Sequence, residues 1–237
     1  MKKRQLLREK HHRETRQRRI ILIGGIVLVA VAVVGWLIYQ NTRPVGSYVT
    51  VTSTPPPNSD GSALGSPDAK VTVMAFEDFQ CPVCRIFSET IWPRIVADYV
   101  ETGKIRYDFR HVIVIDRGGS ESRHAAEASE CAAEQGWFWP YETMLFANQT
   151  GENVGDFTDN RLNAFATALG LDTTKFESCF NGGKYRTVVD ADIAAATQLN
   201  IQGTPSVYVP GHAVLEGLKG YEVYQQAIDA ALAAAGK

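Results

Sequence analysis

The pattern of hydrophobic and polar positions changes character twice along the chain, and the first change marks a candidate membrane segment. Residues Ile20–Tyr39, IILIGGIVLVAVAVVGWLIY, contain no charged side chain. As a helix, a segment of this length crosses the roughly 30 Å hydrocarbon core of a bilayer. Trp36 and Tyr39 lie where aromatic side chains favour the membrane interface. The pattern predicts a single N-terminal transmembrane helix at residues 20–39.

The charges on either side of this segment predict its orientation. The first 19 residues contain nine Lys or Arg against two Glu, whereas residues 40–237 contain 15 basic and 24 acidic side chains. Basic residues beside a membrane helix tend to stay in the cytoplasm. Residues 1–19 are therefore predicted to be a cytoplasmic tail, and the C-terminal part to be extracytoplasmic. The alternative is a cleaved signal peptide, but its apolar core is usually shorter and ends at a small-x-small site, which GWLIYQNTR lacks.

Residues 40–66 have a different composition, dominated by Pro, Ser, Thr and Gly and without a helical period. The three consecutive prolines at 55–57 favour a locally extended backbone. Such a composition is typical of a flexible tether. We therefore predict a linker at residues 40–66 and a folded domain at residues 67–237.

From residue 67 onward, apolar runs with strand and helix periodicity indicate an α/β domain. Strands are predicted at Lys70–Phe76 and Lys104–Val114, and a late hairpin at Pro205–Val209 and Ala213–Leu218. One helix is predicted between the first two strands, ending near Tyr99. The remaining predicted helices are Ser120–Gln135, Trp137–Ala147, Thr158–Leu169, Thr173–Phe180, Tyr185–Leu199 and Tyr221–Ala235. The order is β-α-β, a helical block, and then α-β-β-α.

The candidate chemistry lies in DFQCPVCRIF, residues 78–87, where two cysteines flank Pro82 and Val83 directly after the first predicted strand. Pro82 suits the first position of a helix, which makes Cys81 the N-cap and places Cys84 one turn later on the same face. A thiolate at an N-cap accepts backbone N–H bonds and lies at the positive end of the helix dipole. We therefore expect the pKa of Cys81 to fall below the ordinary value of about 8.5.

Two other roles for this pair are less consistent with the sequence. A four-cysteine zinc site usually combines two CxxC motifs, but the other two cysteines, Cys131 and Cys179, are far apart and form no second motif. A structural Cys81–Cys84 disulfide would close so short a loop that it would constrain the unfolded chain little. Redox exchange is therefore the favoured chemistry, with Cys81 as the nucleophile and Cys84 as the resolving thiol.

Three stretches resemble the DsbA-like thioredoxin-fold thiol:disulfide oxidoreductases. They are LGSPDAKVTVMAFEDFQCPVC (64–84), CAAEQGWFWPYETMLFANQ (131–149) and GTPSVYVPG (203–211), in the order that the family has them. The resemblance implies a thioredoxin fold with an inserted helical domain, about residues 118–183, and a cis proline, Pro205, facing the cysteines after Thr204. An X-Pro bond is also the only peptide bond that is cis at modest cost. A cis bond here would leave the Thr204 backbone free to pair with a substrate strand beside Cys81.

The chain departs from the family pattern at two positions. The best-known members have His as the second residue between the cysteines, where this chain has Val83. Without that imidazole, Cys81 should be less acidic than in the strongest oxidants of the family. Thioredoxin-like proteins also often have a buried acid six residues before the nucleophile, where this chain has Ala75. Glu77 and Asp78 are nearer and are interpreted either as proton-transfer groups or as solvated carboxylates at the rim.

Cys131 and Cys179 remain outside this motif, and two leftover cysteines in an oxidising compartment seldom both stay free. We predict a structural disulfide between them that joins helices of the insertion. A relay role, in which this pair passes electrons to Cys81–Cys84, stays open as the alternative.

The function predicted from the sequence is that of a membrane-anchored extracytoplasmic enzyme that oxidises cysteines of exported proteins. A reductase or isomerase with the same fold is the alternative, because the direction of exchange depends on a reduction potential that spacing does not give. A non-catalytic tethered chaperone is less consistent with an intact pair of thiols at a helix start. No cofactor or metal is expected, since no dinucleotide or phosphate loop is present. The family resemblance implies a membrane redox partner that is DsbB-like or vitamin K epoxide reductase-like.

Overall fold

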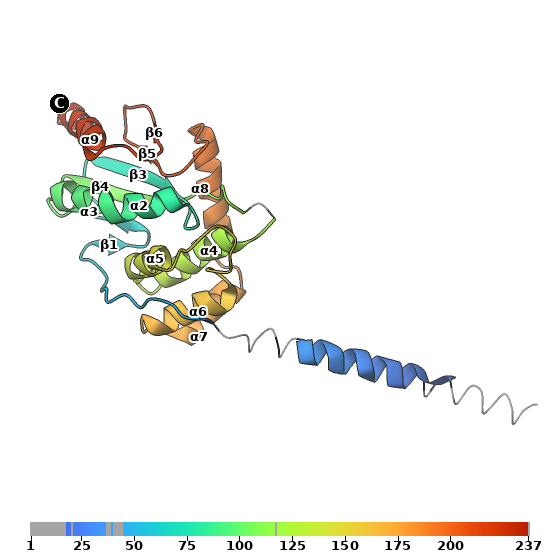
Figure 1. Cartoon of the computed structure of the whole chain (residues 1–237). Coiled ribbons are helices and arrows are strands. Elements are labelled where there is room, and N and C mark those ends of the chain that lie inside the picture. The colour runs from blue at the N-terminus through green and yellow to red at the C-terminus, as the bar shows by residue number, and fades with distance from the viewer. Residues whose placement is uncertain (1–17, 20, 37–38, 40–44, 117, 237) are drawn as a thin grey trace, which may run out of the picture. The chain divides into compact units, whose positions relative to one another are not determined.

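The computed structural model describes residues 18, 19, 21–36, 39, 45–116 and 118–236, and it divides the chain into two compact units, Met1–Val45 and Gly46–Lys237 (Figure 1). In the first unit, residues 21–36 are helical. No helix among the described residues is both long enough and apolar enough to cross a membrane. The predicted membrane segment also includes residues 20, 37 and 38, which lie outside the described residues.

The second unit has the thioredoxin fold, built on a six-stranded sheet with the order β1-β2-β4-β3-β5-β6. Its two central strands, β3 (Val71–Glu77) and β4 (Ile105–His111), run parallel, and every other pairing is antiparallel. Parallel neighbours need a crossover connection. Here it consists of α2 (Pro82–Thr90), α3 (Trp92–Ile95) and the π-helix η1 (Val96–Val100). The sequence predicted one helix here, but Pro93 starts a new helix because its ring and missing N–H are tolerated only in a first turn.

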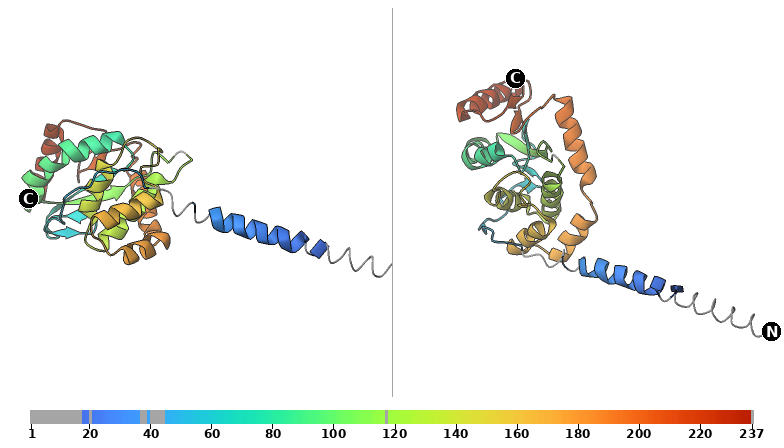
Figure 2. Two further views of the ribbon diagram at one scale, coloured as in Figure 1. Left: turned by 60° about the horizontal axis from the view of Figure 1, so that its bottom comes forward. Right: turned by 45° about the vertical axis from the view of Figure 1, so that its right-hand side comes forward.

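Alternating side chains of β3 enter two cores on opposite faces of the sheet. Val71, Val73 and Ala75 contribute to the main core, whereas Phe76 belongs to a small cluster with Ala196 of α8 (Arg186–Gln198). The C-terminal helix α9 (Tyr221–Ala235) packs on the main core. Figure 2 (right) accordingly shows α8 on one side of the sheet and α2 and α9 on the other. The strand therefore ends with its last residue, Glu77, on the face of the main core.

The helical insertion between β4 and α8 consists of α4 (Glu121–Ala133), α5 (Phe138–Ala147), α6 (Asp159–Ala168) and α7 (Thr173–Asn181). Its aromatic side chains Phe138, Tyr141, Phe165 and Phe176 are fully buried in the same cluster as the sheet residues. The insertion and the sheet thus share one hydrophobic core. The chain returns to the sheet through β5 (Ser206–Tyr208) and β6 (Leu215–Glu216).

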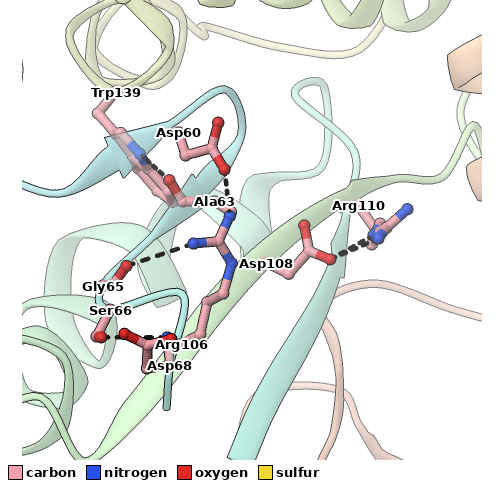
Figure 3. Close-up of polar contacts among 9 residues, drawn as sticks. All are labelled: Asp60, Ala63, Gly65, Ser66, Asp68, Arg106, Asp108, Arg110 and Trp139. Carbon is pink, nitrogen blue, oxygen red and sulfur yellow. Dashed lines mark hydrogen bonds and ion pairs between the residues drawn. The ribbon is translucent and has the colours of Figure 1, made fainter.

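The segment predicted as a linker, residues 40–66, differs from that expectation, because residues 46–66 belong to the compact domain. Strands β1 (Ser59–Asp60) and β2 (Ala63–Leu64) form a hairpin that extends the sheet beside β4. Arg106 of β4 donates to the Asp60 carboxylate (2.7 Å) and to the Gly65 carbonyl (3.4 Å), and the Trp139 indole donates to the Ala63 carbonyl (3.4 Å). Figure 3 shows these contacts converging on the hairpin.

Residues 46–51 also pack on the insertion. Asn148 accepts from the Val49 N–H (2.7 Å) and donates to the Val49 carbonyl (2.8 Å), and the ring of Tyr48 lies edge-on against Phe165. The local composition favoured a coil, whereas the side chains that hold this segment lie about a hundred positions later in the sequence. The folded domain therefore begins near Gly46 instead of Pro67.

Candidate active site

The two cysteines of the CPVC motif lie at the start of α2, which is separated from the end of β3 by four residues. Cys81 is the N-cap residue, with an extended backbone, and Pro82 opens the helix. Cys84 lies one turn later. Neither cysteine is in a disulfide, so the structure shows the dithiol form. Cys81 keeps 6% of its surface exposed and Cys84 none, so an incoming sulfur can reach only the first cysteine.

The electrostatic environment lowers the pKa of Cys81 to about 6. The largest cause is a hydrogen bond that the Cys84 thiol donates to the Cys81 thiolate, which outweighs the opposing effect of burial. The Thr204 side chain and the backbone N–H groups of Val83 and Cys84 contribute further stabilisation. The Thr204 hydroxyl is buried without a partner among the described residues in the dithiol state, so it is available to the thiolate.

Burial has the opposite effect on Cys84, whose pKa it raises well above the ordinary value. The hydrogen bond to Cys81 and the negative charge of Glu77 act in the same direction. At neutral pH the site therefore holds a thiolate at Cys81 and a thiol at Cys84. This division gives the two sulfurs different roles in exchange, because only a thiolate is an effective nucleophile or leaving group.

The Thr204–Pro205 segment lies beside the cysteines although it is 123 positions later than Cys81. The Cys81 Sγ lies 3.5 Å from the Thr204 carbonyl oxygen. The peptide bond between Thr204 and Pro205 is cis, and β5 starts at the next residue. The structure thus brings together four residues singled out from the sequence: Cys81, Cys84, Thr204 and Pro205.

Cys131 and Cys179 form a disulfide between α4 and α7, with their Cα atoms 5.8 Å apart. These two helices of the insertion carry none of the four residues above. Cys131 is fully buried and Cys179 is 7% exposed. The bond closes a loop of 48 positions that contains α5 and α6.

The two acids before the motif are both buried, and they differ in their contacts. Asp78 accepts hydrogen bonds from the backbone N–H groups of Gln80, Val114 and Ile115, at 2.9, 2.9 and 3.2 Å. It therefore ties the loop before Cys81 to the loop after β4. Burial, opposed by these bonds, raises the pKa of Asp78. A carboxylate with three backbone donors has a structural role, so the alternative of a solvated rim position is wrong for Asp78.

Glu77 is 3% exposed and faces the core, so the rim interpretation is wrong for this residue as well. One of its oxygens accepts from the Tyr107 hydroxyl at 3.4 Å, and the other is buried with no hydrogen-bond partner in the described part of the chain. Burial raises its pKa well above the ordinary value, and the negative charges of Glu142 and of Cys81 act in the same direction. The raised pKa favours the protonated form of Glu77, and the charge of this group is coupled electrostatically to both cysteines.

Two glutamines that the sequence analysis did not single out hold the loop before Cys81. Gln80 is fully buried; its amide donates to the Ser122 hydroxyl (2.8 Å), and its carbonyl accepts from the Asn153 N–H (2.6 Å). Gln149 donates to the Phe79 carbonyl at 2.6 Å. Both tie this loop to the insertion. Gln149 is the last residue of the second stretch that resembles the family, 131–149. Its place in that stretch is the sequence feature that could have pointed to its role.

The comparison with known protein families agrees with this geometry. The family model described as thioredoxin matches residues 58–230. The chain belongs to the thioredoxin family. Disulfide bond formation protein D of Bacillus subtilis is 30% identical over 171 residues, covering 70% of this chain and 74% of the relative. Probable disulfide bond formation protein D of Bacillus cereus is 28% identical over 196 residues, covering 81% and 87%.

Solved structures show the same fold. The oxidised BdbD of Bacillus subtilis superimposes with a TM-score of 0.62 and 26% identity, over 78% of this chain and 100% of that one. The α-DsbA1 of Wolbachia pipientis shares the fold, with a TM-score of 0.63 and 24% identity over 76% of this chain and 94% of its own. This DsbA-like thioredoxin-fold protein is a protein thiol:disulfide oxidoreductase, as the sequence predicted.

Proposed function

We propose that this oxidoreductase works outside the cytoplasm, anchored to the cell membrane, and donates the Cys81–Cys84 disulfide to cysteines of exported proteins. The observation that supports the oxidising direction most directly is the Cys81 pKa of about 6. A stabilised thiolate lowers the free energy of the dithiol form, and the corresponding disulfide is then a stronger oxidant. The names of the two Bacillus relatives, disulfide bond formation protein D, agree with this direction.

In the proposed cycle, a client thiolate attacks the Sγ of Cys81. A bond forms between the client sulfur and Cys81, the Cys81–Cys84 bond breaks, and its electron pair passes to Cys84. Cys84 is fully buried and its pKa is raised, so its sulfur takes up a proton. The second client thiolate then attacks the client sulfur of the mixed disulfide. The client is released oxidised, and Cys81 leaves as the thiolate that the helix N-terminus stabilises.

The reduced enzyme must then be reoxidised, and a membrane redox partner of the DsbB-like or vitamin K epoxide reductase-like kind would accept the two electrons. All the chemistry lies in the two sulfurs, so the proposal needs no metal or prosthetic group. Thr204 and Pro205 would position the client strand beside Cys81. The Cys131–Cys179 disulfide would stabilise the insertion and take no part in the exchange.

The location rests on residues 1–39. The nine basic residues and two acids of residues 1–19 precede a segment without charges, a pattern typical of a signal anchor with a cytoplasmic N-terminus. On this proposal residues 1–19 are a cytoplasmic tail and residues 20–39 the anchor. Protease added to intact cells should digest the catalytic domain while residues 1–19 stay protected. Recovery of a soluble mature chain beginning after Tyr39 would contradict the proposal.

The division of roles between the cysteines can be tested by trapping. Replacing Cys84 with Ala removes the thiol that competes for the mixed disulfide, so clients should accumulate covalently on Cys81. Cys81→Ala should trap nothing, and Pro205→Thr should prolong the mixed disulfides. If Cys81→Ala traps clients and Cys84→Ala does not, the roles are reversed.

The direction of exchange can be tested by equilibrating the protein with glutathione. A potential near or above about −180 mV agrees with an oxidase or isomerase. A value near the roughly −270 mV of thioredoxin would instead identify a reductase. That second outcome would overturn the oxidising role and leave the trapping result intact.

A further inference from the structure

The loop that joins α5 to α6, residues 148–158, is attached to the chain on both sides of the two cysteines. The hydrogen bonds that attach it run from the Gln149 side chain to the Phe79 carbonyl (2.6 Å), from the Asn153 N–H to the Gln80 side chain (2.6 Å), and from Arg85 of α2 to the Gln149 carbonyl (2.9 Å). Gln80 directly precedes Cys81 in the sequence. The α5–α6 loop therefore lies alongside the reactive cysteine, and the cycle above gives it no role.

Carboxylates at both ends of this loop hold its backbone in place. The contacts are those of the Thr150 and Gly151 N–H groups with Asp156 (2.5 and 3.2 Å), and those of the Gly155 and Phe157 N–H groups with Glu121 of α4 (2.9 and 2.8 Å). Val154 packs over Gly151, where a Cβ atom would lie only 3.2 Å from the Cγ1 atom of Val154. The loop is thus ordered in the free protein, and a client that contacts it would not have to order it first.

Val154 is the apolar side chain that this ordered loop presents to solvent. It is 61% exposed, the highest value for a large apolar side chain among the described residues of the compact domain. A single exposed valine is common on protein surfaces and has no meaning by itself. Val154, however, directly follows Asn153, whose N–H is bonded to the residue before Cys81. An apolar contact is therefore available beside the sulfur that the client must reach.

The client chain is the occupant that fits this position. Its attacking sulfur must come within bonding distance of Cys81, so the residues next to its cysteine are brought to the same place. An extended chain advances about 3.3 Å per residue, so side chains one to three positions from the client cysteine lie within about 10 Å of Cys81. An aliphatic side chain gains by leaving water against Val154, whereas a polar side chain does not.

We propose that Val154 is a specificity-determining residue, which receives an aliphatic side chain of the client that lies one to three positions from the reacting cysteine. The proposal rests on attack at Cys81 in the cycle above and holds for either direction of that cycle. The contact forms before the client sulfur bonds to Cys81, and it is lost when the client leaves. It should therefore change kcat/KM for clients that carry the aliphatic side chain and leave the exchange between the sulfurs unaltered.

The test measures how fast the oxidised full-length protein reacts with a set of peptides of equal length, each with one cysteine. The reference peptide has Ser at the three positions on either side of the cysteine, and each other peptide has Leu at one of these positions. Leu on one flank should raise kcat/KM by about three- to tenfold. Val154→Ser should remove this advantage and leave the rates of the reference peptide and of glutathione unchanged.

Val188→Ser is the matched control, because Val188 is an exposed valine of α8, on the other side of the sheet from α2. This variant should keep the full advantage of Leu, and Val154→Leu should keep it as well. A Leu advantage that is absent from the unaltered protein, or that persists in Val154→Ser, would overturn the proposal. If Val154→Ser slows every peptide and glutathione equally, Val154 is structural and the proposal also fails.

A second measurement distinguishes the client from the membrane redox partner as the occupant. Reduced full-length protein is mixed with membranes of the source cells, and the rate of its reoxidation is followed. Val154→Ser should reoxidise as fast as the unaltered protein. A slower reoxidation combined with unchanged peptide rates would assign Val154 to the partner and overturn the proposal. The peptide rates do not depend on the glutathione potential, so a low potential would contradict the oxidase function alone.

Discussion

The lowered pKa of Cys81 predicts that the stability of the reduced protein rises with pH in a window that the oxidised protein lacks. In the unfolded chain a cysteine titrates near about 8.5, whereas folding lowers the pKa of Cys81 to about 6. A group with a lowered folded pKa adds stability above the unfolded value and loses it as the pH falls through the folded value. The contribution should therefore be absent below pH 6 and grow steadily between about pH 6 and 8.5.

The size of the effect follows from the two pKa values. The thiolate should add almost nothing to the stability of the folded dithiol at pH 5, on the order of 1 kcal/mol at pH 7 and on the order of 2–3 kcal/mol at pH 8. Cys84 stays a thiol over this range because burial raises its pKa, so it adds no second titration. For a two-electron couple, about 1.4 kcal/mol corresponds to about 30 mV. At pH 7 the disulfide should therefore be more oxidising, by on the order of 30 mV, than one with an unperturbed thiol.

The measurement is denaturant unfolding of the reduced protein at several pH values from 5 to 8, with reduced Cys81→Ser as the control. The control retains Glu77, Glu142 and the histidines, so the difference between the two curves reports the Cys81 thiol together with its coupling to Glu77. We expect this difference to widen by roughly 2–3 kcal/mol across the range. Parallel curves, or a thiolate absorbance midpoint at pH 8 or above, would refute the assignment of a stabilised thiolate to Cys81.

Three other contacts give predictions on stability. The Cys131–Cys179 bond closes a loop of 48 positions, so its reduction in a Cys81→Ser/Cys84→Ser background should cost about 4 kcal/mol. A Cys131→Ala/Cys179→Ala protein should still oxidise clients, whereas loss of oxidation would indicate a relay. Asn148→Ala removes both hydrogen bonds to Val49 and should cost about 1–2 kcal/mol, with faster proteolysis within residues 46–51; unchanged proteolysis would contradict this. Asp78→Asn places an amide against backbone donors and should cost about 1–3 kcal/mol in denaturant unfolding, and an unaltered midpoint would exclude a structural role for Asp78.

The elements of the domain could be predicted from local pattern, because strand alternation and helical periodicity are properties of neighbouring residues. The predicted strand Lys70–Phe76 and helix Tyr221–Ala235 match β3 and α9 to within one residue at each end. Cys81 was predicted as an N-cap from Pro82 alone, since proline is favoured in a first turn. Residues 46–66 could not be placed in this way. Their partners, such as Asn148 and Arg106, are distant in sequence, and only the folded chain brings them together.

The membrane anchor remains a prediction from composition and charge, because residues 20, 37 and 38 lie outside the described residues.

The two acids that precede the CPVC motif have different environments, which the sequence analysis did not distinguish. The sequence gives Glu77 and Asp78 the same two possible roles, although β3 ends between them. Glu77 continues the alternation of Val71, Val73 and Ala75 on the buried face, whereas Asp78 belongs to the loop. If the predicted strand had been extended by one residue, from Phe76 to Glu77, the alternation would have identified Glu77 as a buried acid and Asp78 as a carboxylate of the following loop.

The position of Glu77 also bears on the direction of the reaction. Thioredoxin-like proteins often have their buried acid at the position of Ala75, two residues earlier on the same strand face. Two residues of a strand span about 6.6 Å, so Glu77 holds the acid closer to the start of α2. Burial and the negative charge of Glu142 raise the pKa of Glu77 well above its ordinary value, which favours the protonated acid. In an oxidase the first step creates a buried Cys84 thiolate that needs a proton, which a protonated Glu77 can give. In a reductase the corresponding group must instead remove the Cys84 proton, for which an ionised acid is required. The raised pKa of Glu77 is therefore consistent with the proposed oxidising direction.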